Sequence, residues 1–292
     1  MTLQGMERFG ESKYEAKRNH QMQNGIYSHS TAKAYHRDCQ KFAEYVKEHG
    51  ANGRYTHLNE TKELAKEYLA REIESGKSAY TIKGERSALA KLFGVEGKEL
   101  AAKVPERSRE NITRSREHYV ISEITGKKIL NQSARAGHFS EKTHPDLVAF
   151  CNGTGLRRAE LNHVRGDQFG IDEKGNYIIR IVDNQAKGGK ERIVHVLDNS
   201  EKVRELCERA GHNCVFDKIP QSMDVHYYRG RYATNRYNSL ARPINEIPPN
   251  ERYYCRGDRK GEVYDRVAMW IVTHDLGHNR LNVLSEHYLR DE

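Results

Sequence analysis

The sequence contains no apolar run long enough to cross a bilayer. Its longest, VAMWIV from Val267 to Val272, falls far short of the roughly 20 residues that a membrane-spanning helix needs. The first twenty residues, MTLQGMERFGESKYEAKRNH, have no apolar core of the signal-peptide kind. From these two absences we expect a soluble, intracellular protein with no membrane partner.

Cysteines are few and scattered, which argues against a disulfide framework. There are five in 292 residues, an odd number, and we expect free thiols in a reducing compartment. Cys207, His212 and Cys214 in CERAGHNC resemble part of a zinc site, but no second ligand pair stands at zinc spacing. We therefore expect neither a metal nor another cofactor.

The composition indicates a globular protein with a heavily charged surface. Apolar residues make up 36% and charged residues 31% of the chain, and the formal net charge is +8. An excess of positive charge favours an anionic partner, either a membrane surface or nucleic acid. With 292 residues the chain is long enough for two domains, since single cores rarely grow beyond about 250 residues.

The first hundred residues predict a small all-helical domain at 28–104, after a polar, flexible tail at 1–27. Apolar residues recur at helical spacing in 28–50, 59–76 and 78–94, and glycine follows each stretch. We take Ser30 as the N-cap of the first helix. The apolar faces of these helices are expected to form the core.

A basic linker is predicted at 105–117. It contains Arg107, Arg109, Arg114 and Arg116 and little apolar periodicity. Such a run is usually a solvated connection between domains. It can also lie along a phosphate backbone, where each basic contact releases counterions.

The remainder, 118–292, reads as a mixed domain, so that the fold class is mainly α with small β-hairpins (α+β). Two β-branched runs, Tyr177–Val182 and Arg192–Val196, flank a Gly-Gly turn and predict a hairpin with a basic tip. A second hairpin insertion is predicted near 250–266, turning on glycines. Helices are expected at Asn199–Ala210, at Val225–Ala241 and from Val267 to the end.

Polar residues that no predicted element needs occur in four separated stretches. They are Arg157 with Glu160 in GLRRAEL, Lys187 in AKGGKER, His226 and Arg229 in HYYR, and His278 with Tyr288 in LGHNRLNVLSEHYL. Taken singly, each has an ordinary explanation: Arg157 and Glu160 have the spacing of a surface ion pair, and a lysine on a turn aids solubility. His226 and Arg229, which are three positions apart on one helical face, are harder to explain as structural residues, since a protonated histidine and an arginine repel each other.

In this order these residues resemble the pattern of the tyrosine recombinases of the phage-integrase family, most closely the integrases of conjugative transposons. The family has Arg, Lys, His-x-x-Arg, His or Trp, and then Tyr, with an acidic residue three positions after the first Arg. The resemblance covers the chain from Ser28 to the end. The interval from His278 to Tyr288 is one residue longer than is common in the family, and His274 and His287 are additional imidazoles near the site.

The resemblance implies a two-domain DNA clamp, with a SAM-like core-binding domain followed by a catalytic domain. Tyr288 would be the nucleophile that forms a 3′-phosphotyrosine, Arg157 and Arg229 the phosphate clamp, and Lys187 the general acid. His226 would be the general base and His278 a phosphate contact, with Glu160 in support. The linker arginines would contact DNA.

The implied activity is site-specific DNA recombination that integrates and excises a mobile element without a metal. The implied partners are double-stranded DNA, three further copies of the chain in a tetramer, and an excisionase, in a bacterial cytoplasm at the nucleoid. Two alternatives stay open. A type IB topoisomerase shares the residues but would relax DNA without a specific site, and an accessory DNA-binding protein would not cut.

Overall fold

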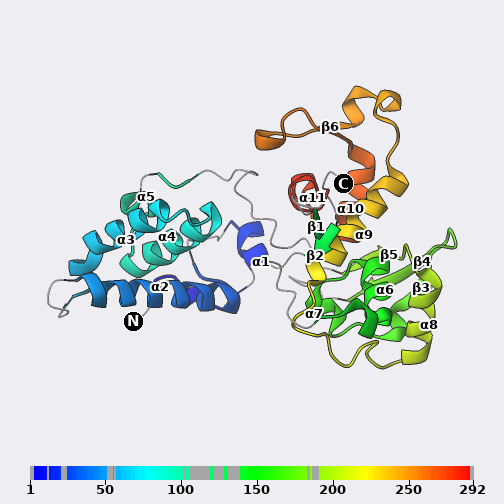
Figure 1. Ribbon diagram of the computed structural model, residues 1–292, viewed down its shortest axis with the longest axis horizontal. Helices are drawn as coiled ribbons and strands as arrows, with labels where there is room; N and C mark the ends of the chain where they lie inside the picture. The colour runs from blue at the N-terminus through cyan, green and yellow to red at the C-terminus, as the bar shows by residue number, and fades with distance from the viewer. Residues whose placement is uncertain are drawn as a thin grey trace. The chain divides into compact units, whose positions relative to one another are not determined.

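The chain divides into two compact units, Met1–Thr113 and Arg114–Glu292. The computed structural model describes residues 3–11, 13–20, 25–50, 55, 57–101, 103–105, 119–121, 128–130, 139–182, 185 and 191–289. The first unit is blue to cyan in Figure 1 and the second runs from green to red. The four linker arginines and Lys187 lie outside the described residues.

The regular elements in the described part of the first unit are all helices. Its elements are η1 (Met6–Arg8), α1 (Lys13–Arg18), α2 (His29–His49), η3 (Leu58–Thr61), α3 (Lys62–Glu74), α4 (Ala79–Phe93) and α5 (Gly97–Leu100). The predicted N-cap of α2, Ser30, is wrong by two residues, since the Ser28 hydroxyl accepts from the Thr31 N–H at 3.3 Å. The apolar faces of α2, α3 and α4 form the core, with Phe42 and Leu69 at its centre.

Part of the stretch predicted as a flexible tail packs into this core. Leu3 and Ile26 are buried among the apolar side chains of the helices. The Gln4 N–H donates to the Lys91 carbonyl of α4 at 3.1 Å, and the Ile26 N–H donates to the Gly5 carbonyl at 2.7 Å. The composition of 1–27 is polar, but Leu3 and Ile26, near its two ends, pack into the core of the first unit.

In its described residues, the second unit combines helices with three small antiparallel sheets. Its helical elements are η5 (Glu141–Thr143), α6 (Pro145–Thr154), α7 (Arg158–Leu161), η6 (Gly166–Gln168), α8 (Ser200–Ala210), α9 (Val225–Leu240), η7 (Ile244–Glu246), η8 (Pro249–Glu251), η9 (Gly257–Arg259), α10 (Arg266–Asp275) and α11 (Leu281–His287). Its strands are β1 (Tyr119–Ile121), β2 (Lys128–Leu130), β3 (Phe169–Ile171), β4 (Tyr177–Ile181), β5 (Arg192–His195), β6 (Arg252–Tyr254) and β7 (Val263–Asp265). The predicted α+β class is confirmed.

The central sheet has the order β3-β4-β5. The register pairs Ile179 with Val194 and Ile181 with Arg192, so that these four side chains share one face. That face is buried against the helices of the unit, and the Arg192 side chain is largely buried with it. Both predicted strands of the first hairpin are confirmed. Strand β3 was not predicted, because the three residues Phe169–Ile171 are too few to show alternation.

Helix α9 packs against α6 and α10 at the centre of the second unit. Tyr228 and Tyr232 of α9 are fully buried there. Helix α6 ends at Gly155, which has a φ of 57° and brings the chain directly against the Tyr232 ring. This close turn fixes the start of α7 relative to α9.

The helix predicted from Val267 to the end is broken. Helix α10 ends at Asp275, and Gly277, with a φ of 66°, turns the chain before α11 begins at Leu281. The His278 N–H donates to the Thr273 carbonyl at 2.8 Å and closes the turn. Among the described residues, no helix is both long and apolar enough to span a membrane.

Candidate active site

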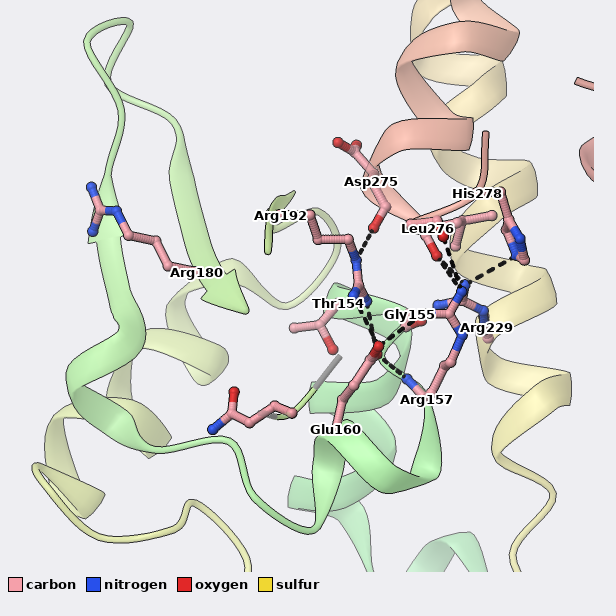
Figure 2. Close-up of polar contacts among 12 residues, drawn as sticks. Thr154, Gly155, Arg157, Glu160, Arg180, Arg192, Arg229, Asp275, Leu276 and His278 are labelled. Atoms are coloured by element: carbon pink, nitrogen blue, oxygen red, sulfur yellow. Dashed lines mark hydrogen bonds and ion pairs between the residues drawn. The ribbon is translucent and has the colours of Figure 1, made fainter. Parts of the chain in front are cut away.

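Four of the predicted site residues converge within the second unit from four different elements. Arg157 is the N-cap of α7, Arg229 lies in α9, His278 follows α10 and Tyr288 is the C-cap of α11. Figure 2 shows Arg157, Arg229 and His278 pointing toward one another across the ends of these helices. The helix ends bring free backbone carbonyls into the same space.

Arg229 is the centre of the cluster and is only 1% exposed. Its guanidinium donates to the carbonyl of Gly155 at 2.5 Å and to the carbonyl of Leu276. Its Nε donates to the phenolic oxygen of Tyr288 at 3.1 Å. Burial lowers the Arg229 pKa to about 10, so the side chain stays cationic at neutral pH.

Arg157, the N-cap of α7, reaches the same carbonyl. One of its terminal nitrogens donates to the Leu276 carbonyl at 2.8 Å, the oxygen that also accepts from Arg229. The two guanidiniums therefore meet at one carbonyl oxygen. Because both guanidiniums reach the same oxygen, they lie close enough together to bind one external anion jointly.

Tyr288 is 8% exposed, and its ring packs in the apolar core beside Leu284. Its phenolic oxygen has two hydrogen-bond partners among the described residues, Arg229 and the Nε2 of His278 at 3.3 Å. The Arg229 guanidinium carbon also lies 5.5 Å from the centre of the Tyr288 ring.

His278 is held neutral by its surroundings. Burial, and then the positive charges of Arg229, Arg157 and Arg192, lower the His278 pKa to about 3. A neutral imidazole has one nitrogen without a proton. With Nε2 in that state, His278 can accept a hydrogen bond from the Tyr288 hydroxyl.

Glu160 is fully buried between two arginines. Its carboxylate accepts from the Arg157 side chain at 2.9 Å and from the Arg157 backbone N–H at 2.7 Å. Arg192 donates two parallel bonds to the same carboxylate, at 2.8 and 2.7 Å. Burial alone would raise the Glu160 pKa, but the bonds and charges of Arg192 and Arg157 outweigh it and lower the pKa to about 2.

Arg192 was missed as a site residue when the sequence was interpreted. It stands at the start of β5, and its Nε also donates to the Asp275 carbonyl at 2.9 Å (Figure 2). A signal was present, because Arg192, Val194 and Val196 alternate and share the inward face of their strand. An arginine in phase with two buried valines predicts a buried charge with a partner.

Asp275 was also missed. Its buried carboxylate accepts from His195 Nδ1 at 3.0 Å, from Arg236 Nε at 3.0 Å and from the Tyr232 hydroxyl at 3.3 Å. These bonds attach the end of α10 to β5 and α9. Because Leu276 and His278 follow directly, Asp275 fixes the carbonyl and the imidazole that face the two arginines.

Two predicted site residues are not part of this cluster as described. His226 is exposed at the start of α9, and its backbone N–H donates to the Asp224 side chain at 3.0 Å. Lys187 lies outside the described residues. In the described part of the chain, no three His, Cys, Asp or Glu side chains gather where they could hold a metal ion.

The N-terminal region of the chain matches a known domain family. Residues 19–96 match the phage integrase, N-terminal SAM-like domain, so the predicted resemblance is confirmed for this region and the first unit contains that domain. No curated protein matches the chain.

Several solved structures are similar in overall trace. The Tn1549 transposon integrase (residues 82–397) in complex with circular intermediate DNA is 11% identical, with 96% of this chain and 94% of that chain covered and a TM-score of 0.42. The XerH site-specific recombinase bound to a palindromic difH substrate is 18% identical, with 87% and 74% covered and a TM-score of 0.46.

Proposed function

We propose that the chain is a tyrosine recombinase, a site-specific DNA recombinase that cleaves and rejoins strands through a 3′-phosphotyrosine at Tyr288. One observation carries the proposal: the buried Arg229 donates to the Tyr288 phenol while sharing the Leu276 carbonyl with Arg157. The phage integrase SAM-like domain in 19–96 supports DNA as the substrate. So does the net charge of +8.

The two arginines supply the charge that phosphoryl transfer needs. A scissile phosphate bound next to the Leu276 carbonyl would receive N–H bonds from both guanidiniums on its non-bridging oxygens. Planar guanidinium forks match phosphate oxygens well, and donors fixed before the reaction stabilise the charge that develops in the transition state. Because these cations carry the charge, we infer that cutting proceeds without a metal.

The phenol must lose its proton to attack. In the resemblance the general base is His226, but His278 is the imidazole in contact with the phenolic oxygen, at 3.3 Å. We infer that His278 Nε2 orients the phenolic hydroxyl by accepting its hydrogen bond. It takes up the proton once the anionic phosphate has entered and offset the positive charges that lower its pKa, and as an imidazolium it can then donate to a non-bridging phosphate oxygen. His226 stays a candidate base for a conformation in which DNA occupies the site.

The reaction balances without an external energy source. The Tyr288 oxygen attacks phosphorus, the bond from phosphorus to the 5′ oxygen breaks, and Lys187 protonates that leaving oxygen. The phosphoester is stored on the protein, so a second 5′-hydroxyl can attack it and release the phenol. This reversal converts cutting into strand exchange, which we infer takes place in a tetramer on DNA, with an excisionase assisting excision.

Covalent capture tests the proposal. A pool of nicked duplexes with randomised sequence is incubated with the protein and denatured, and protein-linked DNA is isolated and sequenced. We expect a covalent complex enriched in one sequence, because the nick lets the short fragment that bears the free 5′-hydroxyl diffuse away, which traps the intermediate.

Two variants serve as a matched pair. Tyr288→Phe should give no covalent complex, since the nucleophilic oxygen is gone, whereas Tyr254→Phe, on the exposed part of β6, should react like the unmodified protein. An unchanged yield with Tyr288→Phe would rule out Tyr288 as the nucleophile. Complexes without sequence enrichment, together with relaxation of supercoiled DNA, would favour a type IB topoisomerase.

A further inference from the structure

The hairpin β6–β7 carries a buried arginine at its turn. Arg259 is 3% exposed although it lies in η9, between two short strands and far in sequence from the core helices. Figure 1 shows this orange hairpin and the red α11. The contacts of Arg259 join the two elements.

Arg259 binds backbone carbonyls on both sides of Tyr288. One terminal nitrogen donates to the carbonyl of Ser285 and, at 3.0 Å, to the carbonyl of Leu289. These two residues stand three positions before Tyr288 and one position after it. The guanidinium therefore spans the backbone segment that carries the phenol.

The end of α11 needs such a donor. The N–H groups of Tyr288 and Leu289 both bond to the Leu284 carbonyl, at 2.9 and 3.0 Å. The Ser285 carbonyl, which the Leu289 N–H would bond in a continuing helix, is left without that intrahelical partner. Arg259 replaces it from outside the helix and fixes where α11 stops.

The cost of burying this charge is offset within the hairpin. Glu262 accepts from Arg259 Nε at 2.8 Å and from a second guanidinium nitrogen, and the Tyr264 hydroxyl is a further partner. Tyr264 in turn donates to Glu262 at 2.8 Å. The pair is thus internally neutral, and the carbonyls of the nucleophile segment take the remaining N–H groups.

The opposite side of the segment is held by α9. The Thr234 hydroxyl donates to the Tyr288 carbonyl at 3.2 Å. Helix α9 also carries Arg229, so one side of the segment is tied to the phosphate-binding arginine and the other side to the hairpin. The phenol is positioned only while both attachments hold.

We propose that Arg259 is a positioning residue for the nucleophile, and that the β6–β7 hairpin exists in part to set the position of Tyr288 relative to Arg229. This role rests on the proposed function of Tyr288. Arg259 does not touch the reacting atoms; it acts through the carbonyls of Ser285 and Leu289.

Cleavage measured separately from binding tests this role. At saturating concentrations of the nicked duplex selected above, Arg259→Gln should form the covalent complex at least about tenfold more slowly, because misplacement by about 1 Å can cost up to a hundredfold. The Kd for the same duplex should stay unchanged. Arg259→Lys should lie between the two proteins, since an ammonium can bond one carbonyl but lacks the fork.

A control and a second measurement keep the result interpretable. Arg256→Gln alters an exposed arginine of the same hairpin and should cleave like the unmodified protein. In Arg259→Gln, hydrogen exchange should rise for the amides of Tyr288 and Leu289 and stay unchanged in α9.

Two results would overturn the role of Arg259. The first is cleavage by Arg259→Gln at the rate of the unmodified protein. The second is an equal loss of cleavage, DNA binding and Tm, which would mean that Arg259 stabilises the fold in general and does not position the nucleophile. If the unmodified protein itself forms no covalent complex, the proposed function fails first, and this role with it.

Discussion

At the scale of single residues, the second unit keeps four charged side chains in one hydrogen-bonded chain. Arg192, Glu160 and Arg157 are linked by carboxylate–guanidinium bonds, and Arg157 meets Arg229 at the Leu276 carbonyl. Buried ion pairs are expensive to desolvate and are weak evidence for stability. Their placement here beside the Tyr288 phenol fits the proposed role of these side chains in binding a phosphate.

Glu160→Gln tests the internal balance of these charges. The substitution keeps the shape of the side chain but leaves two partly buried guanidiniums without their anion. We expect the free energy of unfolding to fall by about 3 kcal/mol or more. Chemical denaturation measures it, and Glu205→Gln, an exposed partner of Lys202 on α8, should change it by less than about 1 kcal/mol. Equal effects of the two variants would contradict the buried network.

The depressed pKa of His278 predicts a dependence of stability on pH. Burial and then the neighbouring arginines lower this pKa from 6.5 to about 3 in the folded protein. Between these values the unfolded chain binds a proton that the folded chain does not, so stability falls as the pH falls from 6.5 toward 3. Glu160, with its pKa lowered from 4.5 to about 2, acts in the same direction below pH 4.5.

Replacement of His278 isolates its part of this effect. In His278→Asn the loss of stability between pH 6.5 and 5, above the Glu160 window, should be smaller than in the unmodified protein. Denaturant titrations at several pH values measure it, and His212→Asn, at the exposed end of α8, serves as the control. If His278→Asn leaves the pH slope unchanged, His278 is not held neutral.

At the scale of elements, the site depends on where helices stop. The end of α6 at Gly155 supplies a carbonyl to Arg229, and the end of α10 supplies the Leu276 carbonyl to both arginines. The end of α11 presents Tyr288. Each stop has a local cause: Gly155 and Gly277 adopt positive φ, and Arg259 caps α11.

Gly155→Ala tests the first of these helix ends. A Cβ at this position would lie 2.4 Å from the Tyr232 ring, and φ is 57°, which L side chains rarely adopt. We expect a loss of stability above about 1 kcal/mol, with reduced covalent capture, because Arg229 loses a fixed acceptor. Gly230→Ala, in α9 with open space around it, should be neutral or slightly stabilising in the same denaturation experiment.

The sequence predicted helices better than their breaks. Periodicity gave α8 and α9 to within one residue at each end, because their apolar faces are regular. The break after α10 was missed, since one glycine in an amphipathic pattern does not by itself end a helix. The packing of Leu3 and Ile26 was missed as well, because tertiary contacts decide whether a polar segment is anchored.

The candidate site was predicted from residue order, but its connections were not. Arg157, Arg229, His278 and Tyr288 were identified by their pattern, and the structure brings them together. Arg192 and Asp275 act through bonds between β5, α7 and α10, which are far apart in the chain. Such partners depend on how the sheet and helices pack, and sequence spacing does not encode it.

At the scale of the whole molecule, the chain joins two units with different tasks. The first contains the phage integrase SAM-like domain, and the second contains the arginine–tyrosine centre. Each has its own apolar core. With a net charge of +8, affinity for DNA should be dominated by phosphate contacts and fall steeply with salt, whereas the residues of the proposed chemistry lie in the second unit.

Identification of the atom that holds the DNA tests whether Tyr288 is the nucleophile. The protein is reacted with its selected nicked duplex in the presence of a metal chelator and digested with a protease and a nuclease. The DNA-linked peptide is then sequenced by mass spectrometry. We expect a nucleotide joined through its 3′-phosphate to Tyr288. A linkage to any other side chain, or no linkage until a divalent metal is added, would contradict it.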